Sequence, residues 1–579
     1  MIIKTTNQTN NSLENLWATT VLFSLFFVSG FTALLYQVAW QRMLGLFSGS
    51  DVRSVTIVIA SYLLGLGLGN LISSRHSDRF NNRQCVQING LCNFGIALFA
   101  ISRRFLFYDL LFLRWQSLAQ FPLLMLGIVL VSLLVPTTLM GLSLPLLSKA
   151  INRGVDKAAS RIGWLYGVNT LGSGLGTLIS GWYIVGTFGY EKTIHLGATF
   201  STCVSLTALI IARQFQQDND NYVLPQNINI AGAYRQKQKS IKEWYLLVFL
   251  SGFAAISWEI IWFRVLDIAL QSNAYTYAHL LAFVLVSNGL GSLLGSKAIA
   301  YIRNPKKTFL LIQGTVAVYS AIAIWLIAII WQTYPELRAG EGYVNLNNID
   351  FPLIFKYLIV PSIMMILPNL LLGFYFPLVQ KAVQKDGKAI AKGVGSILVA
   401  NILGNVLGSL VTGLILLDLL GTSGSIKLLC CIGLGFLIVI RPNLIKAKVT
   451  LALTIIALIL VIAFPHSNQL WAALQGIPSD DYFIVSEDST SVAAITEKDN
   501  KGKQYASGQV QANFPYMHIH GLLGSVPALL HPHPTDVMII GLGSGGTPHS
   551  IGTNPATKQI KIVELLGAEL TVLKEYAQT

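Results

Sequence analysis

The sequence predicts a mainly α-helical membrane protein, built as a bundle of two parallel six-helix repeats and followed by a small β unit and an incomplete α/β segment. Of its 579 residues, 53% are hydrophobic and only 11% are charged, and long apolar runs recur along the chain. A soluble protein has too little interior to bury such a composition, whereas about 20 apolar residues at a time span a bilayer. The other two observations are an internal repeat and a change of character near Trp471.

The first part of the chain returns in the second. The segment SGFTALLYQVAWQRML from Ser29 matches SGFAAISWEIIWFRVL from Ser251, and this alignment pairs Trp40 with Trp262. Two further matches follow in the same order at a slightly larger shift: PTTLMGLSLPLLSKA with PNLLLGFYFPLVQKA, and NTLGSGLGTLISG with NILGNVLGSLVTG. The extra residues fit a polar insertion at 335–350. Three ordered matches indicate a duplicated unit.

Each repeat contains six predicted spans. In the first repeat, residues 19–213, they lie near 19–40, 54–74, 85–102, 119–148, 162–186 and 193–212. In the second repeat, residues 244–440, they lie near 244–263, 274–300, 308–332, 352–380, 393–417 and 424–440. Because six is even, both repeats enter the membrane from the same side, which makes them parallel.

Lysine and arginine are concentrated in the loops that follow even-numbered spans. The linker between the repeats, residues 214–243, carries Arg235, Lys237, Lys239 and Lys242. The positive-inside rule therefore places the N-terminal segment, residues 1–18, in the cytoplasm and the protein in the inner or plasma membrane. The net charge of +14 follows from this bias, so we expect no nucleic-acid partner. The amino end has no cleavable signal pattern, so we expect the first span to be retained.

A further apolar run lies within residues 441–465. The stretch Val449–Phe464 is preceded by Arg441, Lys446 and Lys448. About 16 apolar residues can form either a short crossing or a re-entrant or interfacial segment. We favour a thirteenth span because of the preceding cations, and this span would carry everything after it to the outer face.

Glu259 and Arg264 are the candidate functional residues of the membrane part. A carboxylate within an apolar run is costly in lipid, so Glu259 could face the bundle interior and meet a cationic substrate or a proton. The alternative is an ion pair at the helix end among Glu259, Arg264 and Asp267. His279 is expected to be a hydrogen-bonded core residue. The five cysteines lie at no metal-ligand spacing, so no metal site is predicted.

The membrane part resembles the major facilitator superfamily, whose two halves are parallel repeats. A second likeness is GNLISSRHSDRFNNR, residues 69–83, in which Asp78, Arg79 and Arg83 match the loop that this superfamily carries between its second and third helices. The central glycine of that loop is replaced here. The alternative interpretation is an ordinary basic loop. The resemblance implies a transporter or a sensor of small metabolites.

From about Trp471, short β-branched runs broken by Asp, Asn and Gly predict a β unit within residues 470–535. Residues 536–579 then read as strand VMII, turn GLGSGG, a helix, and strand IKIV ending at Glu564. This order predicts a partial Rossmann-like, nucleoside-binding segment. The glycines permit a tight turn, and an acid at the end of the second strand accepts hydrogen bonds from ribose hydroxyls.

The segments EDSTSVAAI, HIHGLLGSVPALLHPHPTDVMIIGLGSGGT and IVELLGAEL together resemble the opening of spermidine synthase, an aminopropyltransferase, and of bacterial proteins in which such a domain follows a multi-span membrane domain. The resemblance implies transfer of an aminopropyl group from decarboxylated S-adenosylmethionine to a polyamine, without a tightly bound cofactor. It assigns the nucleoside end of the donor to Gly541, Gly543, Ser544, Gly545 and Gly546. It also assigns the ribose to Glu564 and the amine pocket to His520.

The chain departs from that family in three respects. Ile519 precedes His520 where soluble synthases have Tyr-His, and residues 502–520 contain no Asp or Glu, although a dicationic acceptor needs carboxylates. The catalytic aspartate of the family falls beyond the second strand, so no catalytic residue can be named. A single β-α-β unit cannot cover both faces of a parallel sheet. We therefore expect an incomplete or split domain, with a separate polypeptide completing it as a candidate partner.

Two functions remain in competition. The first is a membrane protein of the spermidine synthase-like family that lacks the catalytic part. The alternative is a facilitator-type transporter or sensor of small cationic metabolites, whose tail is a non-catalytic nucleotide-binding remnant. A dinucleotide-dependent oxidoreductase fits the glycine pattern but not the β segment before it. In either of the first two cases the expected partners are the lipid bilayer and a small polyamine or nucleoside ligand.

Overall fold

The computed structural model describes residues 2–48, 52–152, 155, 157–215, 230–271, 276–337, 351–384, 386–440, 448–478, 481–498, 501–514 and 518–578. Within these ranges, ten helical stretches are long and apolar enough to cross a membrane. Two of them, residues 158–214 and 390–438, contain 57 and 49 residues. At about 1.5 Å per residue each is long enough to cross twice. The bundle therefore accommodates all twelve predicted spans.

The helices follow the predicted order. The first repeat contains α1 (Ile2–Ser48), α2 (Val52–His76), α3 (Asn82–Arg103), α4 (Pro122–Ile151), α5 (Ala158–Ile179) and α6 (Val185–Ile211). The second contains α7 (Ile230–Ala269), α8 (Thr276–Ala298), α9 (Pro305–Thr333), α10 (Phe351–Ile354), α11 (Leu367–Val383), α12 (Ile390–Val411) and α13 (Leu417–Ile438). The tenth span combines α10, the π-helical stretches Phe355–Ile359 and Ser362–Ile366, and α11.

The two repeats pack in the same way and meet each other in a reciprocal pattern. Within the repeats, α1 packs on α5 as α7 packs on α12, and α2 packs on α4 as α8 packs on α11. Between them, α5 packs on α8 and α12 packs on α2. Exchanging the repeats maps each of these pairs onto the other, which is the relation expected of parallel repeats. The predicted fold class, two parallel six-helix repeats followed by a small sheet and an α/β segment, is confirmed.

Glycines at equivalent positions let equivalent helices touch. A Cβ added to Gly172 would lie 2.1 Å from the carbonyl oxygen of Phe27, and one added to Gly404 would lie 2.0 Å from that of Phe249. The two glycines occupy the same place in the matching segments NTLGSGLGTLISG and NILGNVLGSLVTG. Without an aqueous driving force between helices, such close backbone approach supplies the packing energy.

The turn between the fifth and sixth spans is also built identically in both repeats. Gly189 has a φ of 73° and Gly421 a φ of 64°, and the same alignment of the repeats pairs these two glycines. Only glycine adopts this backbone region without strain. Each turn follows a π-helical stretch, Ser180–Ile184 in the first repeat and Thr412–Leu416 in the second.

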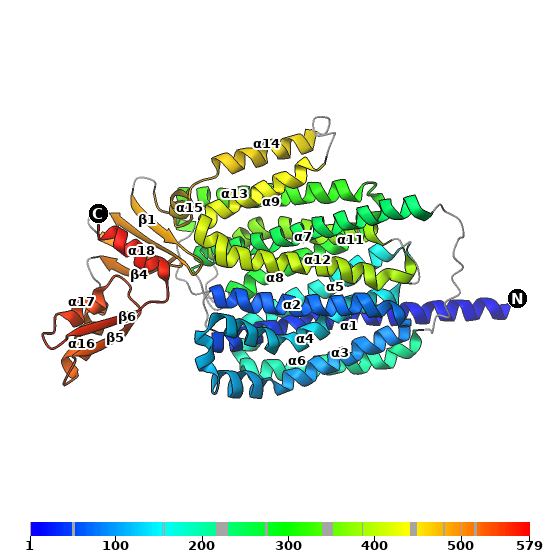
Figure 1. Ribbon diagram of the computed structural model, residues 1–579, viewed down its shortest axis with the longest axis horizontal. Coiled ribbons are helices and arrows are strands. Elements are labelled where there is room, and N and C mark those ends of the chain that lie inside the picture. The colour runs from blue at the N-terminus through cyan, green and yellow to red at the C-terminus, as the bar shows by residue number, and fades with distance from the viewer. Residues whose placement is uncertain are drawn as a thin grey trace.

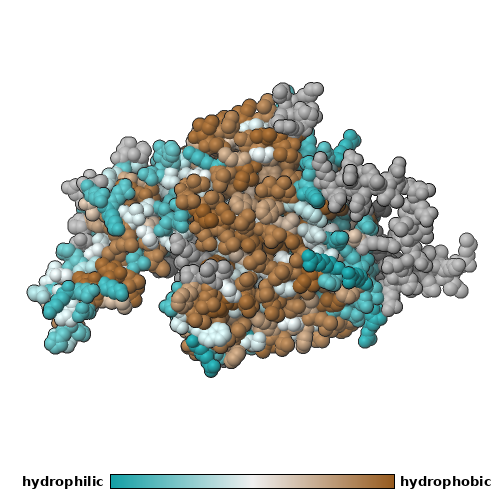
Figure 2. Space-filling model, in the orientation of Figure 1, coloured by the Kyte–Doolittle hydropathy of each residue, from teal (hydrophilic) through white to brown (hydrophobic). Residues whose placement is uncertain are grey.

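Large aromatic side chains fill the cores of both repeats at matching places. Tyr36 stacks on Trp40 with ring centroids 5.0 Å apart, and Trp258 stacks on Trp262 at 6.2 Å. All four side chains are buried. Around these cores, hydrophobic residues form a broad belt over the bundle, with hydrophilic residues gathered toward its ends (Figure 2). This distribution is that of a multi-pass membrane protein.

Helix α14 (Lys448–Ala463) continues the chain beyond the second repeat. It packs on α9 and α13 and runs along the edge of the bundle (Figure 1). The next helix, α15 (Ser467–Leu474), is bent by 97° from it. Figure 1 shows the C-terminal part at the end of the bundle opposite the N-terminus. The bent pair of α14 and α15 fits either a broken span or a re-entrant segment, so the thirteenth span stays a prediction.

The C-terminal part contains two small sheets. Strands β1 (Tyr482–Glu487), β2 (Val492–Lys498), β3 (Lys501–Ala506) and β4 (Gln509–Phe514) form an antiparallel meander in sequence order. Then follow α16 (His518–Leu530), β5 (Asp536–Ile540), α17 (Gly546–Gly552), β6 (Gln559–Val563) and α18 (Gly567–Tyr576), with β5 and β6 parallel.

Helix α18 covers the meander rather than the parallel pair of strands. Ala568 and Val572 of α18 are buried against Ile484 and Ile495. The parallel pair keeps apolar side chains in the open, and Ile540 is 83% exposed. This confirms the expectation that one β-α-β unit leaves its sheet partly uncovered.

Candidate functional site

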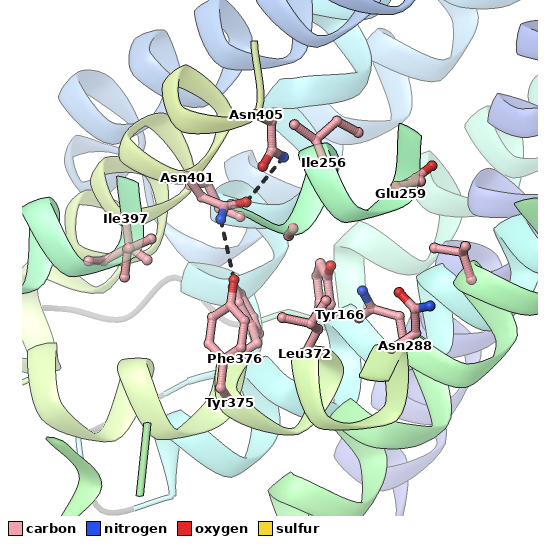
Figure 3. A pocket seen from close by; sticks show the side chains of 15 residues that line it. Tyr166, Ile256, Glu259, Asn288, Leu372, Tyr375, Phe376, Ile397, Asn401 and Asn405 are labelled. Atoms are coloured by element: carbon pink, nitrogen blue, oxygen red, sulfur yellow. Dashed lines mark hydrogen bonds between the residues drawn. The ribbon is translucent and has the colours of Figure 1, made fainter. Parts of the chain in front are cut away.

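A polar cavity lies inside the bundle where α5, α7, α8, α11 and α12 meet, and its volume is about 120 Å³ (Figure 3). Its polar lining residues come from both repeats: Tyr166, Glu259, Asn288, Asn369, Tyr375, Asn401 and Asn405. Ionisable side chains within a membrane bundle are rare, and they pair with one another or mark the path of a solute or ion. The cavity is therefore the candidate solute site.

Two of its acceptor groups have no partner. Glu259 makes no hydrogen bond or ion pair with the residues that the structure describes, and it supplies the only carboxylate of this lining. The side-chain oxygen of Asn288 is buried and also lacks a donor among them. An unpaired carboxylate and an unpaired amide oxygen around one cavity favour a ligand that brings hydrogen-bond donors and positive charge.

On the opposite side, Asn401, Asn405 and Tyr375 are joined by hydrogen bonds (Figure 3). Asn405 donates to the side-chain oxygen of Asn401 at 3.4 Å, and Asn401 donates to the Tyr375 hydroxyl oxygen at 3.3 Å (Figure 3). Asn369 donates to the carbonyl of Met365 at 2.8 Å. These groups are pre-oriented, whereas Glu259 and the buried side-chain oxygen of Asn288 accept no hydrogen bond from the described residues. Sequence reasoning found Glu259 but not the asparagines, which come from three separate helices.

Arg264 does not pair with Glu259. Its guanidinium lies 3.6 Å from the carboxylate of Glu487 and donates to the carbonyls of Asp488 and Ser491 at 2.6 and 3.0 Å. Residues three or four apart share a face of a helix, whereas five positions bring Arg264 to a different face from Glu259. The Glu259–Arg264 part of the expected helix-end ion pair is therefore wrong, whereas its third member, Asp267, acts electrostatically on Arg264.

Glu487 attaches the β unit to the bundle. Besides facing Arg264, its carboxylate accepts hydrogen bonds from the backbone and hydroxyl of Thr422, from Ser467 at 2.6 Å and from the indole of Trp471 at 3.1 Å. Charge-assisted hydrogen bonds of this kind are about twice as strong as neutral ones. The quoted segment EDSTSVAAI begins at Glu487, but it gave no sign of this role, because the partners come from three separate helices, α7, α13 and α15.

Asp78 joins the two repeats at the other end of the bundle. Its carboxylate accepts from the backbone amides of Ala391 and Lys392, at 2.9 and 2.8 Å. These amides belong to the first turn of α12, where the helix dipole favours an anion. The loop that resembles the superfamily motif thus bridges the repeats.

His279 is part of the core, where its Nε2 lies 2.7 Å from the carbonyl oxygen of Tyr357 and its ring meets Trp182 and Phe283. Among the residues placed in the structure, no group of three or more His, Cys, Asp or Glu side chains could hold a metal ion.

The glycine turn of the tail closes on Glu564. Gly541, Gly543 and Gly545 have φ values of 90°, 52° and 84°, so the left-handed positions include Gly545 rather than Gly546, the first residue of α17. The Glu564 carboxylate accepts from the amide of Leu542 at 2.6 Å. The structure thereby brings together the turn and the acid that the family resemblance assigns to one nucleoside.

Two other contacts engage the same carboxylate. Glu564 also accepts from the amides of Leu565 and Leu566, at 2.7 and 2.9 Å. A ribose would have to share Glu564 with these backbone groups. Ser544 is buried, and its hydroxyl has no partner among the described residues. His520 lies on α16, which packs on α17.

Glu569 makes the tail sensitive to pH. Its side chain is 3% exposed and accepts a hydrogen bond from Gln504. Burial, followed by the neighbouring Glu564 carboxylate, raises its pKa from 4.5 to about 7. A raised carboxyl pKa means that the folded state holds the proton more tightly than the unfolded state. The stabilisation is complete below about pH 4.5 and is lost as the pH rises through about 7.

We therefore expect hydrogen exchange of the α18 amides, corrected for the intrinsic rate, to show falling protection between pH about 5 and about 8. Glu569→Gln keeps a neutral side chain at this position, so it should flatten the profile. An equally steep profile in this variant would assign the pH dependence to another group.

The fold and cavity together define a class: a polytopic membrane protein of two parallel six-helix repeats with a polar cavity at their meeting. No protein-family model matches the chain, and no curated protein matches it. Among solved structures it is similar to the major facilitator superfamily proton:xylose symporter XylE bound to 6-bromo-6-deoxy-D-glucose, at 14% identity and a TM-score of 0.45, over 75% of this chain and 96% of that one. It is also similar to the nucleoside transporter NupG (D323A mutant), at 10% identity and a TM-score of 0.43, over 76% and 99% of the two chains.

Proposed function

We propose that the chain is a facilitator-type membrane transporter of small organic cations. The observation that carries this proposal is the unpaired Glu259 carboxylate in the cavity where the repeats meet. A carboxylate in a low-dielectric interior is costly unless it meets positive charge or a proton. A solute ammonium group supplies both the charge and the hydrogen-bond donors that Glu259 and Asn288 lack.

The arrangement of the repeats suits transport by alternating access. Transporters built from paired repeats rock one repeat against the other around a central site. Here the repeats meet along the α5–α8 and α2–α12 pairs, and the Asp78 contact with the first turn of α12 crosses between them. Two hydrogen bonds at the bundle end are few enough to break and re-form in each cycle.

Uptake into liposomes tests the proposal. With the purified chain reconstituted, we expect saturable uptake of labelled spermidine or 4-amino-1-butanol and no uptake of labelled xylose or uridine above empty liposomes. Preference for xylose or uridine would contradict the cation proposal. Binding of spermidine without uptake would favour a sensor.

We also propose that the N-terminus is cytoplasmic and the tail lies on the outer face. The positive-inside rule assigns the loops rich in lysine and arginine to the cytoplasm together with the N-terminus, and the C-terminal part lies at the opposite end of the bundle (Figure 1). An alkaline phosphatase fused after Gln475 should be active, because this enzyme works only outside the cytoplasm. An inactive fusion at normal expression would reverse the assignment.

Aminopropyl transfer by the tail stays a prediction of the sequence resemblance, and so does nucleoside binding at the glycine turn. Under the proposed orientation the tail would face away from the cytosolic donor. The transporter proposal does not depend on either property.

A further inference from the structure

A second, larger cavity lies where the β unit meets the bundle, and its volume is about 320 Å³. All three parts of the molecule line it: Gln41 and Thr56 from the first repeat, Phe263 and Tyr277 from the second, and Ser491 and Ser507 from the β unit. We call this cavity the chamber. It follows the central cavity along α7, because Ile260 lines the chamber and the preceding residue, Glu259, lines the central cavity.

The β unit forms a roof over the chamber and is fastened to the second repeat. The amide of Ser489 donates to Asp418 at 2.6 Å, and the side chain of Gln509 donates to the carbonyl of Gln271 at 2.7 Å. The Arg264–Glu487 pair adds a charged contact. If the repeats rock, a roof held in this way moves with the second repeat and shifts over the wall that the first repeat supplies.

The tip of the β3–β4 hairpin fits tightly against the end of α7. Gly508 has a φ of 79°, and a Cβ added there would lie 2.1 Å from the carbonyl oxygen of Ile268. Only glycine satisfies both the backbone conformation and the close contact. Both a close steric fit and a charged contact therefore hold the β unit against the second repeat.

The chamber offers polar groups to a ligand. The Nε of Arg264 and the hydroxyl of Ser491 are buried and have no hydrogen-bond partner among the residues placed in the structure. Arg264 is 8% exposed in its side chain, and four carboxylates act on it electrostatically: those of Glu487, Asp488, Asp418 and Asp267. Of these four carboxylates only that of Asp267 lines the chamber, where it is opposite in charge to Arg264. Arg264 and Ser491 offer donors for an oxygen or nitrogen acceptor on a ligand.

We propose that the chamber is a second binding site for the transported cation, on the route to Glu259, and that the β unit is the roof that must lift to admit it. This inference rests on the proposed function. The ligand class is the small organic cation of the proposed function, with a hydrogen-bond acceptor for Arg264 and Ser491. It also carries an apolar carbon chain, since seven lining side chains, such as those of Ile59, Ile260 and Leu417, are aliphatic or phenyl.

Labelling of a cysteine in the chamber tests the roof. The reporter is Ser507→Cys, in a chain whose exposed Cys203 and Cys431 are replaced by alanine, reconstituted in nanodiscs so that both faces are accessible. A bulky maleimide should react slowly with this reporter. Adding Glu487→Gln should speed the reaction about tenfold or more, because it removes a buried charge-assisted contact. Glu487→Asp, which keeps the charge, should stay closer to the parent.

Matched variants separate lifting of the roof from unfolding. Lys498→Cys lies on an exposed strand end and should react equally with and without Glu487→Gln. Gly508→Ala should also speed labelling of the reporter, because of its clash with Ile268. Gly521→Ala should not, since its Cβ would meet nothing closer than 3.7 Å. If Ser507→Cys with Glu487 intact reacts as fast as Lys498→Cys, the β unit does not cover the chamber and the proposal is wrong.

4-Amino-1-butanol tests the site itself, because it carries an ammonium group, a carbon chain and a hydroxyl oxygen as acceptor. We expect a saturating concentration of it to slow labelling of Ser507→Cys in the parent and to leave Lys498→Cys unchanged. If the cation is taken up into liposomes but does not slow labelling of Ser507→Cys, the chamber is not a binding site, while the transport proposal stands. Protection without uptake would support the chamber and overturn the proposed transport.

Discussion

Glu259→Gln is expected to lower uptake of organic cations about 100-fold, because truncating one partner of a desolvated charge pair costs about 3 kcal/mol. The substitution keeps the size and hydrogen-bonding shape of the side chain and removes only its charge. Glu259 makes no ion pair within the described part of the chain, so no internal contact of this kind is lost with the charge. The effect should therefore fall on the solute and not on the fold. Uptake of a labelled cation over a range of concentrations measures it.

The matched control is Glu243→Gln on the same helix. Glu243 is 52% exposed and pairs with Lys306 at 2.9 Å, a surface contact of small energetic value. This variant should transport like the parent. Glu259→Asp keeps the charge on a shorter side chain and should retain part of the activity. Unchanged uptake by Glu259→Gln at every concentration would remove this residue from the solute site.

Gly404→Leu is expected to destabilise the whole bundle. Its Cβ would lie 2.0 Å from the carbonyl oxygen of Phe249, so α7 and α12 would have to separate. Overpacking of this kind costs about 1 to 3 kcal/mol or more. The loss should appear as a fall of several degrees in the unfolding temperature of the detergent-solubilised protein, and as a lower yield.

Two further leucine variants check the origin of that effect. Gly172→Leu makes the equivalent change in the first repeat, where the Cβ would lie 2.1 Å from the Phe27 carbonyl, so it should be about as harmful. Gly435→Leu places the same side chain where no atom lies within 4 Å of the added Cβ. It should leave the unfolding temperature nearly unchanged. Equal losses for Gly404 and Gly435 would indicate a general intolerance of glycine substitution in these helices.

Much of the bundle could be predicted from the sequence because lipid imposes a local rule. Every backbone polar group in a membrane must be satisfied within its own helix, so apolar runs of sufficient length mark the spans directly. The repeat was visible because the close contacts at Gly172 and Gly404 tolerate only the smallest residue, and this constraint acts twice in the chain. Glu259 was identifiable because a carboxylate in an apolar run is rare.

The surroundings of Glu259 and Arg264 were decided only by the tertiary structure. Five positions on α7 send one side chain into the central cavity and the other toward the β unit, where Arg264 meets Glu487 from a distant part of the chain. The asparagines of the cavity and the cover that α18 gives to the meander were likewise beyond sequence patterns. Periodicity and propensity act over a few residues and therefore determined the spans, the repeat and the strands. Contacts between distant segments depend on how the helices and sheets pack against one another. The central cavity and the chamber under the β unit therefore form only in the folded chain.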